Sequence, residues 1–197
     1  MHRAETGPTH SAIAPSLQVG TITVAVIGAG IQGRAFAQQC AVAGFSVILE
    51  DVMPARLRHA ESELASVGKQ VTLVTTVEDA VREADLVMDF VPDELESKLE
   101  IWSLIDRMAP PRTVMCTPSE VLSITDLASC TYRMDRCVMV RGAIAPIGLV
   151  SVLTARETSA ETRVLAEFVF QQLGRQVTST HDPDLPQLLK NMNAAHL

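Results

Sequence analysis

Long hydrophobic runs, clustered basic residues and a secretory signal are all missing from this chain of 197 residues. Charged residues interrupt every apolar stretch well before the roughly 20 residues that a membrane-spanning helix needs, so the sequence predicts no membrane contact. With a net charge of −7 and no run of Lys and Arg, the chain lacks the footprint of a nucleic-acid-binding protein. Residues 1–20 contain no apolar segment followed by a cleavage site, which predicts a cytoplasmic protein.

The four cysteines, Cys40, Cys116, Cys130 and Cys137, show no Cys-x-x-Cys spacing. We interpret them as free thiols in the core of a protein from a reducing compartment, with metal binding as the alternative. Aromatic residues make up only 4% of the chain, whereas hydrophobic residues make up 47%. Ala, Val, Leu and Ile must therefore fill the core, which is typical of a parallel sheet packed on helices.

A β-branched stretch at residues 22–27 runs directly into a glycine-rich loop, Gly28-Ala29-Gly30-Ile31-Gln32-Gly33. An Ala-rich segment predicted as a helix follows, and after Gly44 a second strand at residues 46–50 ends in Asp51. This order of strand, glycine loop, helix and strand is that of a dinucleotide-binding βαβ unit. An acid at the end of the second strand hydrogen-bonds the ribose 2′-OH, so Asp51 favours NAD over NADP.

The residues of the glycine loop have distinct physical tasks in such a unit. Gly28 permits the tight turn, Gly30 lets the backbone approach a pyrophosphate, and Gly33 lets the helix pack close to the strand. The phosphates would lie at the helix N-terminus, where Ile31 and Gln32 contribute N–H groups. The alternative is a domain of the same fold that has lost its ligand.

Downstream of Asp51 the sequence continues to alternate between strand and helix patterns. Strands are predicted at residues 71–75, 86–91, 113–117, 138–140, 149–153 and 176–180, and helices at 55–67, 77–83, 94–108, 124–129 and from a capping box of Thr158 and Glu161 to about Leu173. This alternation predicts a Rossmann-type α/β fold, a single doubly wound and mostly parallel sheet with helices on both faces. We expect a flexible tail at residues 1–20, the domain at 21–181, and a short helical segment at 182–197.

Further motifs are Ala84-Asp85-Leu86-Val87, Val91-Pro92-Asp93-Glu94-Leu95-Glu96-Ser97-Lys98 and Leu122-Ser123-Ile124-Thr125. With the glycine loop, they resemble the NAD-binding domain of the 3-hydroxyacyl-CoA dehydrogenases, from about residue 22 to about residue 180. The resemblance implies NAD as the cofactor, with residues 28–33 and Asp51 at its adenosine half. It also implies that Asp93 and Lys98 lie along the nicotinamide half. The alternative interpretation of Lys98 is a solvated charge on an exposed helix face.

The residues that carry the chemistry of that family are replaced here. The resemblance implies a His general base, an orienting carboxylate and an active-site Ser. This chain has Arg141 at the His position, Ser151 at the carboxylate position and Glu120 at the Ser position. No His occurs between His59 and His181, and we interpret His181 as a solvated loop residue rather than a displaced base.

Glu120 and Arg141 are therefore the candidate catalytic residues. Glu120 would serve as a base if burial raised its pKa. Arg141 would hold a substrate carboxylate through two hydrogen bonds, with Lys98 as a proton donor to a carbonyl. The alternative is that Glu120 and Arg141 form a salt bridge that fills a vacated pocket.

Two functions remain open at this point. The first is an oxidoreductase of fatty acid metabolism that transfers hydride between NAD and a 3-hydroxy or 3-keto acyl group, carried as a CoA or carrier-protein thioester, or a related hydroxy acid. The second is a module that binds NAD or a partner without catalysis. The family's helical C-terminal domain would begin after Thr180, whereas the chain ends at Leu197. We therefore expect a homodimer or a separate helical partner chain.

Overall fold

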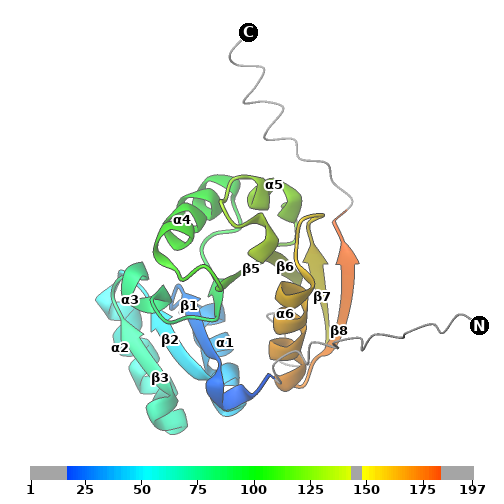
Figure 1. The fold of residues 1–197 in the computed structure, drawn as a ribbon. Coiled ribbons are helices and arrows are strands. Elements are labelled where there is room, and N and C mark those ends of the chain that lie inside the picture. The colour runs from blue at the N-terminus through cyan, green and yellow to red at the C-terminus, as the bar shows by residue number, and fades with distance from the viewer. Residues whose placement is uncertain (1–16, 143–147, 183–197) are drawn as a thin grey trace, which may run out of the picture.

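Aliphatic and β-branched residues dominate the segments that pair into one eight-stranded sheet (Figure 1). The computed structural model describes residues 17–142 and 148–182. The strands are β1 (Thr23–Ile27), β2 (Ser46–Glu50), β3 (Val71–Val74), β4 (Leu86–Asp89), β5 (Val114–Pro118), β6 (Cys137–Arg141), β7 (Leu149–Thr154) and β8 (Gln176–His181). The helices are α1 (Ile31–Val42), α2 (Pro54–Leu64), α3 (Val77–Val81), α4 (Leu95–Met108), α5 (Ile124–Ser129) and α6 (Ala160–Gln172), with 3₁₀ turns η1 (Val19–Thr21), η2 (Ala65–Gln70) and η3 (Met134–Arg136).

The strand order is β3-β2-β1-β4-β5-β6-β7-β8, and β1 to β6 are all parallel to one another. The predicted Rossmann-type fold with a mostly parallel sheet is therefore confirmed. The structure adds a reversal, because β7 runs antiparallel to β6 and β8 runs parallel to β7. The connection from Arg141 to Leu149 is too short for the dozen or so residues of a parallel crossover, which explains the reversal.

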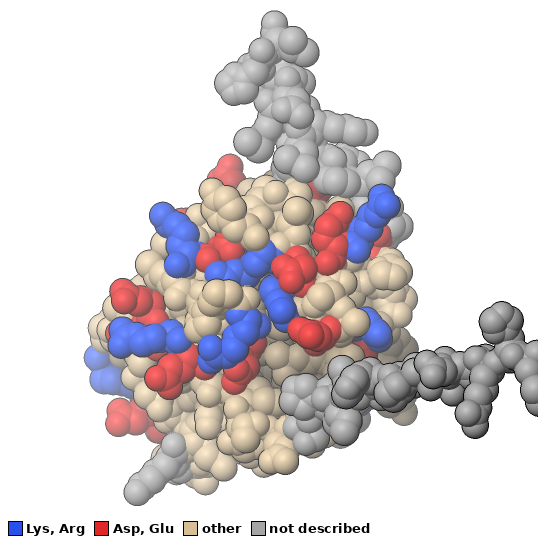
Figure 2. All heavy atoms as spheres, viewed as in Figure 1, with Lys and Arg blue, Asp and Glu red and all other residues tan. Residues whose placement is uncertain are grey.

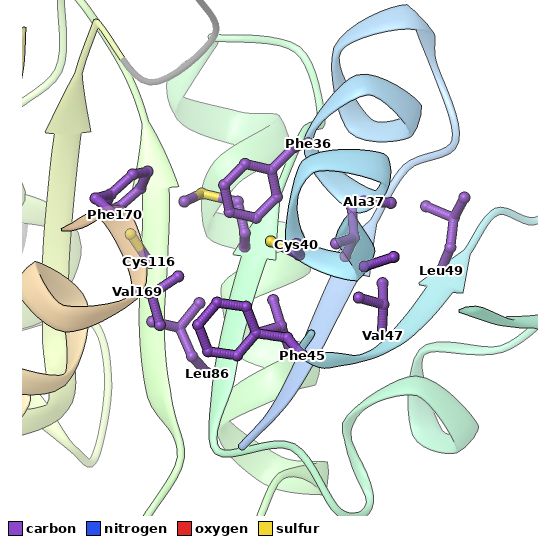
Figure 3. Close-up of a cluster of buried hydrophobic side chains, with 14 of the residues drawn as sticks. Phe36, Ala37, Cys40, Phe45, Val47, Leu49, Leu86, Cys116, Val169 and Phe170 are labelled. Atoms are coloured by element: carbon purple, nitrogen blue, oxygen red, sulfur yellow. The ribbon is translucent and has the colours of Figure 1, made fainter. Parts of the chain in front are cut away.

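Two hydrophobic cores lie on opposite faces of the sheet. Helices α1, α2 and α6 cover one face, where the rings of Phe36 and Phe170 have centroids 6.0 Å apart. Figure 3 shows these two rings with Phe45 and Cys116 in the space between the helices and the strands. Helices α3, α4 and α5 cover the other face, where Trp102 is 1% exposed. Fully buried strands with aliphatic side chains on both faces are typical of parallel sheets covered on both sides.

Two helix starts test the sequence-based capping predictions. Thr76 caps α3 as expected, since its Oγ1 accepts a hydrogen bond from the Asp79 N–H. The capping box of Thr158 and Glu161 is wrong, because Ser159 is the N-cap of α6. The Thr158 hydroxyl instead donates to the Cys137 carbonyl oxygen on β6, at 2.9 Å.

The cysteines are free, but one of them is not in the core. Cys40, Cys116 and Cys137 are buried, and burial raises the pKa of each thiol, that of Cys137 to about 12. Cys130 is exposed, so its assignment to the core is wrong. Among residues 17–142 and 148–182, no group of three or more His, Cys, Asp and Glu side chains is placed to hold a metal ion.

The described surface carries both signs of charge. On the face drawn in Figure 2, acidic and basic side chains are interspersed. Within the part of the chain that the structure describes, no helix is both long enough and apolar enough to cross a membrane. Of the tail predicted at residues 1–20, residues 17–20 are described, and the 3₁₀ turn η1 begins there at Val19. Residues 1–16 of that tail and residues 183–197 of the predicted C-terminal helical segment lie outside the described residues.

Candidate functional site

The strand order of the sheet changes direction at β1, because β1 pairs with β2 on one side and with β4 on the other. In open α/β sheets such a switch point forms a crevice beyond the carboxyl ends of the strands, where ligands bind. The glycine loop connects β1 to α1 at this place. The structure therefore brings the loop, Asp51 and the segment after β4 together.

The three glycines of the loop meet different surroundings. Gly28 has a φ of +99°, and its N–H donates to the Glu50 carbonyl oxygen at 2.8 Å. A Cβ on Gly33 would lie 1.8 Å from the Gly28 carbonyl oxygen, so only glycine lets α1 approach the loop this closely. A Cβ on Gly30 would meet nothing within 4 Å. The loop is thus tightly packed at Gly33 and open at Gly30.

Asp51 is fixed beside this loop. Its side chain is 3% exposed, Oδ2 accepts the Ala29 N–H at 2.9 Å, and Oδ1 accepts the Met53 N–H at 2.8 Å. Arg56 of α2, whose side chain is 53% exposed, reaches Oδ2 at 3.2 Å. Backbone donors and a guanidinium hold the carboxylate in one orientation at the carboxyl end of β2.

Two adjoining pockets flank the loop. A pocket of about 540 Å³, here called the β4–β6 pocket, is lined by Gly30, Gln32, Asp93, Ser119, Glu120 and Gly142, among others. A pocket of about 370 Å³, the β2–β4 pocket, is lined by Gly28, Glu50, Asp51, Val77, Glu100 and Ile101, among others. Both pockets share Arg56 and the segment of residues 90–92. Ile31 is 81% exposed and lines neither pocket.

Lys98 lies in the core and not on the surface. It is 0% exposed, and its Nζ is 2.7 Å from Oδ1 of Asp89. The other oxygen of Asp89 accepts the Trp102 Nε1–H at 2.8 Å. The interpretation of Lys98 as a solvated charge is therefore wrong, and its ammonium lines neither pocket.

Sequence reasoning missed this buried cluster, although two signals pointed to it. Asp89 is the one charged residue in the otherwise apolar stretch of residues 86–91. Lys98 and Trp102 are four residues apart on α4 and so share one face of the helix. A buried acid on a strand needs a donor, and that helix face supplies two.

Glu120 and Arg141 are not joined by an ion pair, so the salt-bridge interpretation is wrong. Glu120 Oε1 accepts the Gly142 N–H at 3.4 Å, and the Glu120 N–H donates to Asp93 Oδ2 at 3.2 Å. Arg141 Nε donates to the Ser119 carbonyl oxygen at 3.4 Å. Glu120 is exposed, so the burial that its role as a base requires is absent.

His181 lies in β8 and not in a loop. It is exposed, and its Nδ1 is 2.9 Å from the Thr154 Oγ1. It lines neither of the two pockets at the switch point.

Glu50 is a second residue that sequence reasoning missed. It is 3% exposed, and its Oε1 has no hydrogen-bond partner. Burial, together with the neighbouring Asp51 carboxylate, raises the pKa of Glu50 from 4.5 to about 7. The signal in the sequence is a pair of acids at the end of an apolar strand, of which only Asp51 had an expected role.

A comparison with known families matches residues 23–182 to the NAD binding domain of 3-hydroxyacyl-CoA dehydrogenase. The chain belongs to this family. The predicted family and the predicted cofactor, NAD, are thereby confirmed, while the roles of individual residues stay predictions. The described residues fit the cofactor, since open space at Gly30 adjoins the N-terminus of α1 and the buried acid Asp51 directly follows β2.

Relatives of the family cover most of this chain. It is 28% identical over 188 residues to the Bacillus subtilis protein named "Probable 3-hydroxybutyryl-CoA dehydrogenase", a match that covers 85% of this chain and 64% of that protein. It is 27% identical to the human mitochondrial hydroxyacyl-coenzyme A dehydrogenase, covering 92% of this chain and 65% of the relative. The crystal structure of a 3-hydroxyacyl-CoA dehydrogenase from Archaeoglobus fulgidus has a TM-score of 0.74 and 27% identity, covering 88% of this chain and 60% of that one. The chain thus spans about three fifths of the length of these relatives.

Proposed function

We propose that this chain binds NAD(H) at the switch point and takes part in hydride transfer to or from a 3-hydroxyacyl thioester. The observation that carries the proposal is the open space at Gly30 between α1 and the β4–β6 pocket. Bound NAD would supply the hydride acceptor. The family membership and the relatives named as hydroxyacyl-CoA dehydrogenases support both the cofactor and the substrate class.

In this proposal the two halves of the cofactor occupy different pockets. The N-cap of α1 is Gly30, which has no side chain that could cap the helix, so the N–H groups of Ile31 and Gln32 are available to a pyrophosphate. Asp51 would accept the ribose hydroxyls, and the β2–β4 pocket beside it would hold the adenine. The nicotinamide half would then extend into the β4–β6 pocket, toward Asp93 and Glu120.

A titration of the purified chain with NADH, followed by nicotinamide fluorescence and repeated with acetoacetyl-CoA, tests the proposal. We expect saturable binding with a dissociation constant on the order of micromolar, followed by oxidation of NADH when the thioester is added. Absence of NADH binding would overturn the proposed function. Binding without oxidation would favour the second candidate.

The second candidate is a module that binds NAD without catalysis. It is favoured by the contacts of Glu120 and Arg141, which bond to backbone groups and leave no buried base in the β4–β6 pocket. No His is among the described residues that line this pocket. Oxidation of NADH by the wild-type chain separates the two candidates, and the substitution of Glu120 tests whether this residue takes part in the chemistry.

Glu120→Gln is expected to lower turnover of acetoacetyl-CoA by about 10²-fold or more, because an amide cannot exchange the proton of the reacting oxygen. NADH affinity should stay within about twofold, since Gln keeps the size of Glu120 and an Oε1 acceptor for the Gly142 N–H. The matched control is Glu157→Gln, an exposed acid between β7 and α6. Steady-state rates of the three proteins check the prediction, and equal rates would remove Glu120 from the chemistry.

A further inference from the structure

Glu50 forms part of the wall of the β2–β4 pocket, although it lies at the end of a strand in the core. Its side chain points to the face covered by α3 and α4, because the side chain of Leu49, its neighbour on β2, lies in the core of the opposite face. It is 3% exposed, yet no donor reaches its Oε1. Buried polar atoms are nearly always hydrogen-bonded, so an unpartnered carboxyl oxygen beside a pocket suggests a ligand atom as its partner.

The groups that face Glu50 leave it without a counterion of its own. On the strands beside it, Val74 of β3 and Ile27 of β1 are its uncharged register neighbours. Three other charged residues line the pocket, namely Asp51 after β2, Arg56 of α2 in contact with Asp51, and Glu100 on α4. Other charged groups on the neighbouring elements do not line it: the Asp89–Lys98 pair across Ile27, and Glu78 and Asp79 of α3 with Arg82. The cations in this set already contact other acids, so none of them serves as a counterion for Glu50, and its neutral form is favoured more than that of an exposed acid.

A neutral carboxyl group carries one O–H donor and one C=O acceptor. An adenine edge offers the complementary pair, the N6 amino donor beside the N7 acceptor. A carboxylate matches only the amino group and would face the lone pair of the ring nitrogen. Glu50 in its neutral form therefore fits adenine, and in its ionised form fits it poorly.

We propose that Glu50 recognises the adenine base of the dinucleotide through both oxygens of its carboxyl group, one as donor and one as acceptor, and so makes cofactor affinity depend on pH. The inference rests on the proposed function, because it takes the adenine to lie in the β2–β4 pocket beside Asp51. It adds a specificity-determining residue to that site.

The direction of the pH dependence follows from the protonation state. In the free domain burial and the neighbouring Asp51 raise the pKa of Glu50 to about 7, so that about half of the Glu50 side chains carry the proton at that pH. The bound base stabilises the protonated form further. Affinity is therefore highest well below pH 7 and falls as the pH rises through that value, and binding above pH 7 takes up protons, at most one for each site.

Calorimetric titrations with NADH at about pH 6 and about pH 8.5 test the proposal, on wild type, Glu50→Gln and Glu50→Leu. We expect wild-type affinity to fall about tenfold over this range, with proton uptake at the higher pH seen as a dependence on buffer ionisation enthalpy. Glu50→Gln should bind with little dependence on pH, because an amide presents the same donor and acceptor at both values. Glu50→Leu should bind NADH weakly at both pH values.

A dinucleotide with hypoxanthine in place of adenine serves as the second ligand. Wild type at about pH 6 should bind it about tenfold more weakly than NADH, whereas Glu50→Leu should not distinguish the two. Glu157→Gln, the exposed control, should match wild type in every titration. Thermal unfolding of each ligand-free variant checks that the domain is folded.

The outcomes of these titrations distinguish the role of Glu50 from the proposed binding of NAD(H). NADH binding that is independent of pH in wild type, or a pH dependence that survives Glu50→Gln, would overturn the role of Glu50 and leave the cofactor site standing. Equal affinity of wild type for NADH and for the hypoxanthine dinucleotide would also overturn the role of Glu50. Failure of wild type to bind NADH at either pH would overturn both.

Discussion

Asp89→Ala is expected to destabilise the domain by about 3–5 kcal/mol. The substitution leaves the ammonium of Lys98, which is 0% exposed, without the carboxylate that lies 2.7 Å away. It also removes the acceptor of the Trp102 Nε1–H. An unpaired charge in the core costs far more than the pair itself contributes, since burial has already removed its water.

Urea denaturation followed by circular dichroism measures this loss. The double variant Asp89→Leu with Lys98→Met removes both charges, and it should recover most of the lost stability. The control is Glu161→Ala, which breaks the ion pair with Arg136 at a side chain that is 82% exposed and should cost less than about 1 kcal/mol. A loss of that small size for Asp89→Ala would show that Lys98 reaches water.

Gly33→Ala is expected to abolish NADH binding, whereas Gly30→Ala should weaken it without disturbing the fold. At Gly33 the added methyl would lie 1.8 Å from the Gly28 carbonyl oxygen, so α1 and the loop must separate. At Gly30 the methyl meets no atom within 4 Å, and the φ of −67° suits any residue. The methyl would there occupy the space proposed for the pyrophosphate.

Thermal unfolding and NADH titration of both variants separate the two effects. Gly33→Ala should lose about 1–3 kcal/mol of stability together with more than about 100-fold in affinity. Gly30→Ala should unfold like wild type and lose about tenfold or more in affinity. The control is Gly20→Ala, which also meets nothing within 4 Å but lies outside both pockets. Unchanged NADH affinity of Gly30→Ala would contradict the proposed position of the pyrophosphate.

The parts of this molecule that the sequence predicts are those set by local physics. The turn at Gly28, the cap at Thr76 and the alternation of strand and helix depend on residues a few positions apart. Short-range patterns of this kind predict the parallel core of the sheet and the place of the glycine loop. They also place Asp51 at the carboxyl end of β2.

The parts that escape prediction depend on residues distant in sequence or on competition between neighbours. The partner of Lys98 is decided by which strand lies under α4, and the burial of Glu50 by the helices above β2. Ser159 displaces Thr158 as the cap of α6 because the hydroxyl of Thr158 finds a carbonyl on β6. The reversal at β7 follows from the length of a connection rather than from any residue pattern.

The position of β1 between β2 and β4 has a consequence for the order in which the newly made chain can fold. The β1, α1 and β2 segments leave the ribosome together, but the second neighbour of β1 is absent at that stage. Asp85, which bonds to Thr23 through both backbone and side chain, follows it by 62 residues. At roughly 5–20 residues per second, one edge of the central strand waits roughly 3–12 s for its partner. Until β4 emerges, that unpaired apolar edge is open to aggregation, which chaperones counteract.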